Sequence, residues 1–328
     1  MAHSQYRGAA PGGPPLFEQV GSGVYAYLQP DGTWGWSNAG LVVDGEATLL
    51  IDTLFDLRLT RAMLDTMRRA VPAAVRIETV VNTHANGDHC YGNELVAGAK
   101  IIASTRTAEE ITHGVSPAMM AILMQQAPTL GSFGEYLTRI FGPFQWENIT
   151  LTPPTETFDG ELTLKVGDKT VQLIEVGPAH TRGDTMVYLP AERLIFTADI
   201  LFIGGHPIIW AGPTSNWLGA CDRILALDVE TIVPGHGPIT DKAGVADLKG
   251  YLEYIHREAR TRYDAGMSAL EAARDIPMDR YATWTDGERI AVNIASIYRE
   301  FSGEPEPQSA LGLLRLMGEF DEERRRSV

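Results

Sequence analysis

The sequence predicts an α/β fold in which two β-sheets form a sandwich. Two successive runs of short strand-like segments, each accompanied by an amphipathic helix, are typical of layered α/β proteins. The chain has 328 residues, of which 44% are hydrophobic, and it therefore buries a large core without disulfide or metal support. Histidine-bearing loops follow several of the predicted strands, which indicates a site where strand ends meet.

The first run of strands begins after residues 1–15, a loose tail rich in Gly, Ala and Pro. Asp44-Gly45 predicts a hairpin turn between two of these strands. A helix over 57–70 is indicated by apolar residues that recur on one face. The predicted strands are 24–28, 34–43, 47–51, 77–82 and 100–103.

The second run repeats this style. Leu162, Leu164 and Val166 alternate with polar residues, as in a half-buried strand. A helix over 215–227 carries an apolar stripe. The predicted strands are 162–166, 171–176, 186–189, 194–197 and 231–233.

Two regions lie outside this repeated pattern. Residues 112–145 form an apolar helical insert, and residues 245–320 are predicted to be helical throughout. Within the second region, Ser268 with Glu271 and Thr285 with Glu288 have the spacing of capping boxes at helix starts.

Charge and cysteine content limit the classes of function. Lys and Arg number 27 against 42 Asp and Glu, so the net charge is −15 and nucleic-acid or anionic-membrane partners are not expected. Cys90 and Cys221 alone make no disulfide framework, and neither a leader peptide nor a membrane-spanning run is expected. We therefore expect a cytoplasmic protein.

Chemistry-bearing residues gather in loops that follow strands. His84, Asp88 and His89 lie in one loop, while His180 and His236 lie in two others. Asp199 closes a further predicted strand. Imidazole and carboxylate groups suit zinc or a similar divalent ion, and ligands collected from separate loops leave an open coordination position, as catalysis requires.

These motifs, in this order, resemble the metallo-β-lactamase fold superfamily over about residues 16–245. The resemblance implies a four-layer αβ/βα sandwich that holds two divalent metal ions, expected to be Zn²⁺, with residues 246–328 as a C-terminal helical extension. It assigns His84 and His180 to the first ion. It assigns Asp88, His89 and His236 to the second ion, with Asp199 as the bridge.

One position departs from this pattern. The family usually has His where Asn86 stands, and an amide oxygen is a weaker ligand than imidazole. The first site is therefore expected to bind loosely, to recruit another ligand such as His206, or to stay empty. The candidate catalytic residues are Asp88, which would orient a metal-bound hydroxide, and Asn86.

Three hypotheses for function remain open. Trp36-Ser-Asn-Ala-Gly40, the Gly-Pro-Ala-His-Thr motif ending at Thr181 and the helical C-terminal region resemble aromatic polyketide cyclases of the actinorhodin cyclase type. Such an enzyme would perform aldol closure and dehydration on a metal-polarised carbonyl, with thioester hydrolysis as an added step. A hydrolase of a lactone, ester or thioester is the alternative enzyme. A non-catalytic scaffold with a degenerate metal site is the third hypothesis.

The expected partner is an apolar or aromatic small molecule, such as a polyketide or an acyl thioester. Met residues suit a pocket that adapts to an apolar ligand, although the Met-rich stretch equally fits core or subunit packing. Either this insert or the C-terminal region offers a surface for a homodimer contact. The predicted pocket residues are Trp36, Met120, Met124, Phe133, His206 and Trp210.

Overall fold

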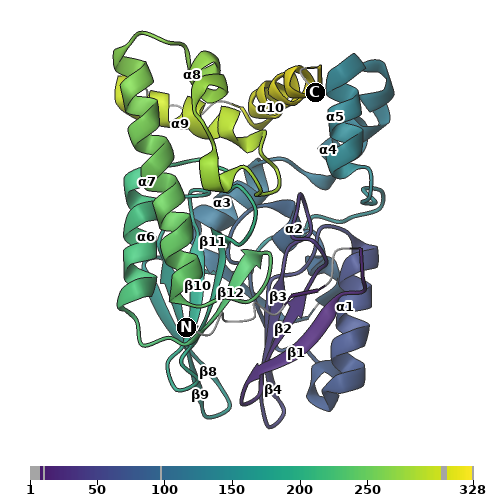
Figure 1. Ribbon diagram of the computed structural model, residues 1–328. Coiled ribbons are helices and arrows are strands. Elements are labelled where there is room, and N and C mark those ends of the chain that lie inside the picture. Colours follow the sequence, from purple (N-terminus) through teal and green to yellow (C-terminus); the bar gives the residue numbers. More distant parts are fainter. Residues whose placement is uncertain (1–7, 10–11, 97, 304–308, 327–328) are drawn as a thin grey trace.

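The computed structural model describes residues 8–9, 12–96, 98–303 and 309–326. Its centre is a pair of β-sheets lying side by side, with helices on the outer face of each (Figure 1). The predicted tail over 1–15 falls partly on residues outside this description. The arrangement is a mixed α/β sandwich, as the sequence predicts.

The first sheet follows chain order from β1 to β7, and its strands change from antiparallel to parallel at β4 and β5. Its strands are β1 (Leu16–Gly21), β2 (Val24–Leu28), β3 (Ala39–Asp44), β4 (Ala47–Ile51), β5 (Thr79–Val81), β6 (Lys100–Ser104) and β7 (Glu156–Phe158). The sequence-based strand over 34–43 is too long at its start, because residues 34–38 form a loop. In that loop Asn38 donates its backbone N–H to the Gly235 carbonyl of the other sheet, and this cross-sheet bond replaces strand pairing.

The second sheet has the order β12-β11-β10-β9-β8, with only β11 and β12 parallel among neighbours. Its strands are β8 (Glu161–Val166), β9 (Lys169–Glu175), β10 (Thr185–Leu189), β11 (Leu194–Phe202) and β12 (Thr231–His236). The inner faces of both sheets contribute to one apolar core, in which Leu49, Val81, Leu173 and Phe196 are buried. This intersheet core holds the two sheets together.

Helices cover the outer faces: α1 lies beside the first sheet, and α6 and α7 lie beside the second (Figure 1). The helices are α1 (Leu57–Ala70), α2 (Gly87–Cys90), α3 (Thr105–His113), α4 (Pro117–Gln126), α5 (Gly131–Phe141), α6 (Thr214–Ala226), α7 (Lys242–Asp264), α8 (Ala269–Asp275), α9 (Arg289–Ser302) and α10 (Ala310–Arg326). Short 3₁₀ turns are η1 (Pro72–Val75), η2 (Asn93–Val96), η3 (Ala127–Thr129) and η4 (Asp279–Tyr281).

Helix α1 shows how the sequence defines such an element. Asp56 accepts a hydrogen bond from the Leu59 backbone N–H at 2.6 Å, which caps the helix start. Met63, Leu64 and Met67 fall on one face and are buried against the sheet, as the periodicity predicts.

The remaining helices gather at one end of the sandwich, where α4 and α5 stand opposite α8, α9 and α10 (Figure 1). Helix α10 packs against both α5 and α9, so the insert and the C-terminal region meet. None of the helices in the described ranges combines the length and the apolar character needed to cross a membrane.

Of the two predicted capping boxes, only the first forms. Ser268 and Glu271 bond reciprocally at the start of α8. The second prediction is wrong, because α9 begins after Glu288 without a side-chain cap. Glu288 instead accepts hydrogen bonds from the Trp34 indole N–H at 2.9 Å and the Tyr136 hydroxyl at 3.3 Å.

Candidate metal centre

The six predicted metal ligands converge at the edge of the sandwich where both sheets end. His84, Asp88 and His89 come from the loop and short helix α2 that follow β5, and His180 comes from the turn between β9 and β10. The other two, Asp199 and His236, lie on β11 and at the end of β12. All six side chains are buried or nearly so.

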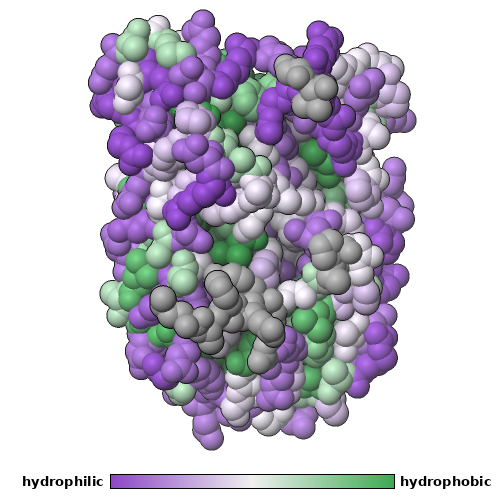
Figure 2. Space-filling view, viewed as in Figure 1, coloured by the Kyte–Doolittle hydropathy of each residue, from purple (hydrophilic) through white to green (hydrophobic). Residues whose placement is uncertain are grey.

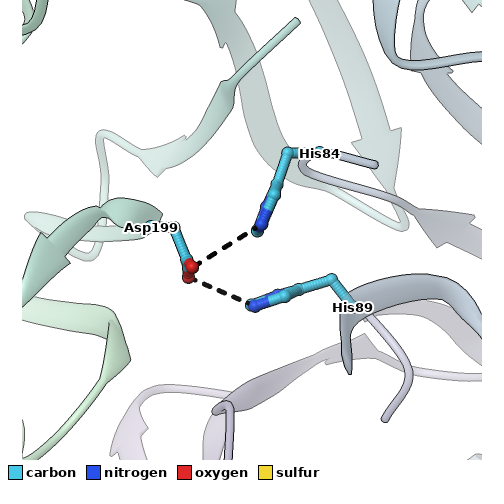
Figure 3. Close-up of side chains that lie close together, drawn as sticks. All are labelled: His84, His89 and Asp199. Carbon is cyan, nitrogen blue, oxygen red and sulfur yellow. Dashed lines mark ion pairs between the residues drawn. The ribbon is translucent and has the colours of Figure 1, made fainter. Parts of the chain in front are cut away.

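Asp199 lies at the centre of the cluster, as Figure 3 shows for two of its neighbours. His89 Nε2 is 3.2 Å from Asp199 Oδ1, while His84 Nε2 is 3.6 Å from Oδ2. His180 Nε2 and His236 Nε2 lie 3.3 Å and 3.4 Å from Asp199 Oδ2. One carboxylate therefore faces four imidazoles.

Two groups of ligand atoms are compact enough to hold a metal ion: Asp88 with His89 and His236, and His84 with His89 and Asp199. The first group matches the second-ion set that the resemblance implies. In the other group His89 takes the place expected for His180, whose Nε2 still faces Asp199. The structure thus brings all the predicted ligands together around Asp199.

The local backbone explains why Asp199 reaches this position. The pairing of β11 with β12 loses register around Ala198, which has a positive φ of 46°. The strand continues to Phe202 and does not end near Asp199, contrary to the sequence-based boundary. Gly235 is required beside it, since a Cβ there would lie 2.0 Å from Asp199 Oδ1.

Each histidine is oriented through its other ring nitrogen. His89 Nδ1 lies 2.8 Å from Asp52 Oδ2, and His236 Nδ1 lies 3.1 Å from the Gly32 carbonyl. His180 Nδ1 lies 2.7 Å from the Ile208 carbonyl. Such partners fix the tautomer that leaves Nε2 free to bind a metal.

The residues present fit a divalent cation. His84 Nε2, His89 Nε2 and Asp199 Oδ1 are buried and have no hydrogen-bond partner among the described residues. Buried polar atoms are rarely left unpaired, because that costs free energy. A cation at the centre of the cluster would satisfy all three atoms.

The pKa directions agree with this reading. Burial lowers the pKa of His84 well below its usual value and that of His180 to about 4, so both rings are neutral. Burial also lowers the pKa of His236, but the carboxylates of Asp199 and Asp88 have the larger effect and raise the pKa of His236 to about 9. The cluster attracts positive charge, which a proton or a metal ion supplies.

Asn86 touches the same centre. Its Oδ1 lies 2.6 Å from His180 Nε2, and Asn86 lines a cavity that opens onto the cluster. Because His180 is neutral and its Nδ1–H is directed to Ile208, Nε2 carries a lone pair. Two acceptors repel at this distance, so the contact is favourable when the amide is turned and its NH₂ donates to Nε2, or when both atoms bind the same cation.

His206 is not a replacement ligand, contrary to the expectation from sequence. Its Nδ1 lies 3.0 Å from the Tyr251 hydroxyl and its Nε2 lies 3.2 Å from the Tyr281 carbonyl. The ring is held among aromatic side chains of the C-terminal region, with Trp284 also in contact. Packing with this region, and not ligand supply, accounts for His206.

The cavity beside the cluster has a volume of about 320 Å³, within the range of small-molecule pockets. Of the predicted pocket residues, Met120 and Trp210 line it. Trp36, Met124, Phe133 and His206 do not; Trp36 packs on Phe144, and Phe133 lies under Arg315. Apart from the metal ligands, its larger side chains are Trp34, Phe55, Tyr91, Glu110, Met120, Phe141, Arg182, Phe202, Ile208, Trp210, Arg289, Leu313 and Leu314.

Three contributors have no role in the sequence-based account. Asp52 orients His89, and its place directly after β4 is a signal of the same kind as the strand-end histidines. Gly235 makes room for Asp199. Arg289, buried at the start of α9, lines the cavity, and nothing in the local sequence distinguishes it from a helix-surface arginine.

Comparisons with known proteins find sequences and structures that are similar to this chain. The chain is 25% identical over 201 residues to 2,4-dinitroanisole O-demethylase subunit alpha of Nocardioides sp. (strain JS1661), covering 60% of this chain and 51% of that one. It is 30% identical over 104 residues, 32% of this chain and 33% of the other, to the Beta-lactamase-like protein 2 homolog of Caenorhabditis elegans. The chain thus spans about half or less of the length of these curated relatives.

Among solved structures, the stereoselective inverting sec-alkylsulfatase Pisa1 from Pseudomonas sp. superposes with a TM-score of 0.65 at 16% identity, over 90% of this chain and 52% of that one. A metallo-beta-lactamase from Pontibacter korlensis gives 0.54 at 19% identity, over 73% and 99% of the two chains. These likenesses show the fold. The model of the metallo-beta-lactamase superfamily matches residues 32–236, which hold every ligand of the cluster, and the chain belongs to that superfamily.

Proposed function

We propose that this chain is a metal-dependent hydrolase that cleaves an ester-type bond in an apolar, aromatic small molecule. One observation carries the proposal: Asn86, Asp88, His180, Asp199 and His236 line a cavity whose other walls include several aromatic side chains. A substrate held by the aromatic walls would therefore present a bond to the metal ligands. Superfamily relatives that include a sulfatase and an O-demethylase subunit support bond cleavage as the reaction class.

Zinc or a similar ion bound by the cluster would supply Lewis acidity and a nucleophile at neutral pH. The chain's own residues supply position and proton handling. Asp88 has its Oδ2 3.3 Å from His236 Nε2, and its carboxylate also lines the cavity, where it can accept a proton from water. Asn86, beside it, has an amide that can donate to an oxygen on which negative charge develops.

The test is a panel of aryl compounds with one ring system and different bonds: carboxylic ester, thioester, lactone, sulfate ester and methyl ether. Wild-type protein loaded with zinc should hydrolyse at least one of them. Asp88→Ala should lower kcat/KM by about 100-fold or more, since it removes a group at the reacting bond. Met119→Ala is the matched control, because Met119 is exposed and does not line the cavity.

Absence of turnover across the panel with zinc bound would contradict the proposal. The polyketide cyclase suggested by the sequence stays a prediction that rests on the same cavity, whose aromatic walls suit a folded polyketide. A poly-β-ketone thioester belongs in the panel for this reason. Ring closure without net hydrolysis would favour the cyclase over the hydrolase.

A further inference from the structure

Arg289 is a buried cation in the wall of the cavity, which is also lined by polar residues that include Glu110 and Arg182. Only 2% of the residue is exposed, although it lines the space where a substrate would lie. Arginine is rarely buried unless its charge is paired and its donors are satisfied. The hydrogen-bond partners of its guanidinium group therefore show what this side chain can still bind.

Two of the three guanidinium nitrogens are occupied. Nη1 donates to the His206 carbonyl at 2.8 Å, and Nη2 lies 3.0 Å from Asp286 Oδ2. The third, Nε, is buried and has no hydrogen-bond partner among the described residues. The side chain thus lines the cavity with the Nε–H donor unused, and each Nη nitrogen carries a second N–H besides the one directed to its partner.

The position of the guanidinium group is fixed from several sides. Its carbon lies 4.4 Å from the centre of the Trp34 ring and 5.4 Å from that of Phe202. The loop before α9 is tied to the segment after β11, because His206 donates its backbone N–H to the Thr285 carbonyl at 3.0 Å. A donor held in this way loses little conformational entropy when a ligand binds.

Phe202 relates this group to the metal centre. Its ring stacks on that of His236, with centroids 5.0 Å apart and an interplanar angle of 4°. Since Phe202 also contacts Arg289, the guanidinium group lies about one aromatic ring away from a metal ligand. An aromatic substrate whose reacting bond faces His236 therefore has room to place a substituent near Arg289.

The charge around Arg289 indicates what kind of substituent fits. Asp286 balances the guanidinium charge; burial raises the pKa of Asp286 to about 6, with Arg289 acting in the opposite direction, so the carboxylate is charged at neutral pH. The carboxylate of Glu288 is buried close by, beside Trp34. A second anion would meet two carboxylates, whereas an uncharged oxygen would only accept the unused hydrogen bond.

We propose that Arg289 is a specificity-determining residue that donates a hydrogen bond to an uncharged oxygen, such as a carbonyl, on an aromatic substrate. The proposal rests on the proposed function in that it places the substrate in the same cavity. It goes further by naming the polar group that the substrate carries away from the bond that reacts.

Calorimetric titration with three naphthalenes that share one substitution position tests this proposal without turnover. Acetylnaphthalene carries an uncharged acceptor, isopropenylnaphthalene has the same shape without one, and naphthoate carries an anion. Wild-type protein should bind acetylnaphthalene about 10-fold more tightly than the other two. Arg289→Met should abolish that preference and leave the affinity for isopropenylnaphthalene unchanged within about 3-fold.

Arg299→Met is the matched control, because Arg299 is also buried on α9 but does not line the cavity, and the preference should persist there. Arg289→Lys keeps the charge beside Asp286 and lacks the Nε donor, so it should lose the preference even if the Met variant does not fold. Trp34→Phe shows what would be seen if Arg289 acted only by positioning Trp34, because this substitution should weaken the binding of all three ligands equally.

Three results would overturn the proposal: no binding of any naphthalene to wild-type protein, tightest binding of naphthoate, or a preference that survives in both Arg289 variants. Equal weakening of all ligands in Arg289→Met would also overturn it, since Arg289 would then act only through Trp34. Because no step depends on hydrolysis, an inactive panel with this preference intact would contradict the proposed function and not the role of Arg289.

Discussion

At the scale of single residues, the cluster depends on small groups that make room as much as on the ligands. Gly235 precedes His236 on β12, and any Cβ at that position would collide with the carboxylate of Asp199. The Pro-Gly-His-Gly motif is visible in the sequence, but the reason for its first glycine lies on the neighbouring strand.

Gly235→Ala should therefore displace Asp199 and weaken zinc binding by about 10-fold or more, in the range seen when groups around a metal ligand are disturbed. Gly219→Ala is the matched control. Gly219 lies exposed within α6 with open space around its Cβ position, so alanine there should stabilise the protein by about 0.5–1 kcal/mol and leave zinc affinity unchanged. Competition with a chromophoric chelator measures the affinity, and unchanged zinc binding in Gly235→Ala would contradict the account.

The residue-level predictions from sequence were of two kinds. The ligands His84, Asp88, His89, His180, Asp199 and His236 lie in motifs whose residue types and order carry the information, and the structure brings them together. For His206 and Trp36 only the residue type and the apolar surroundings point to a pocket. Their positions depend on packing with segments far along the chain, such as Tyr281 and Phe144, which local sequence does not reveal.

At the scale of elements, the two predicted capping boxes have the same spacing but different environments. The Ser268 box is exposed, so its side chains compete only with water, and it forms. At the second position Glu288 is buried beside Trp34 and Tyr136, and these tertiary donors draw the carboxylate away from the helix start. Both motifs are visible in the sequence, but the tertiary contact that decides between them is not.

Ser268→Ala should therefore lower the free energy of unfolding by about 1 kcal/mol, the usual loss for a helix N-cap. Thr285→Ala should cost less, because the Thr285 side chain accepts no capping hydrogen bond from the start of α9. Chemical denaturation of both variants, compared with wild type, measures the difference. Equal destabilisation, or a larger loss in Thr285→Ala, would show that the second cap forms after all.

At the scale of the whole molecule, strand periodicity predicted the layered α/β arrangement, and most strand positions agree to within a few residues. The cavity is different, because it forms where the insert and the C-terminal region meet over the sheet edge. Met120 comes from α4, and Leu313 and Leu314 come from α10, almost two hundred residues later. Local sequence patterns predict these helices but do not indicate that they pack against one another.

The outer surface agrees with the acidic composition. Hydrophilic residues dominate much of the face seen in Figure 2, with smaller apolar patches between them. The protein as a whole carries a net charge of −15. We expect bound positive charge to be concentrated at the metal centre.

The central claim, that the buried His and Asp cluster is a divalent metal centre, is tested most directly by the metal content of the protein. Protein purified without a chelating column should be stripped with a chelator and titrated with zinc, with the bound metal measured by inductively coupled plasma mass spectrometry. Uptake of at least one ion per chain is expected, because two overlapping ligand groups are compact enough to hold a metal ion. Loss of uptake is expected in the double variant His89→Ala with Asp199→Ala, which removes residues from both ligand groups. A folded wild-type protein that takes up no zinc would contradict the central claim.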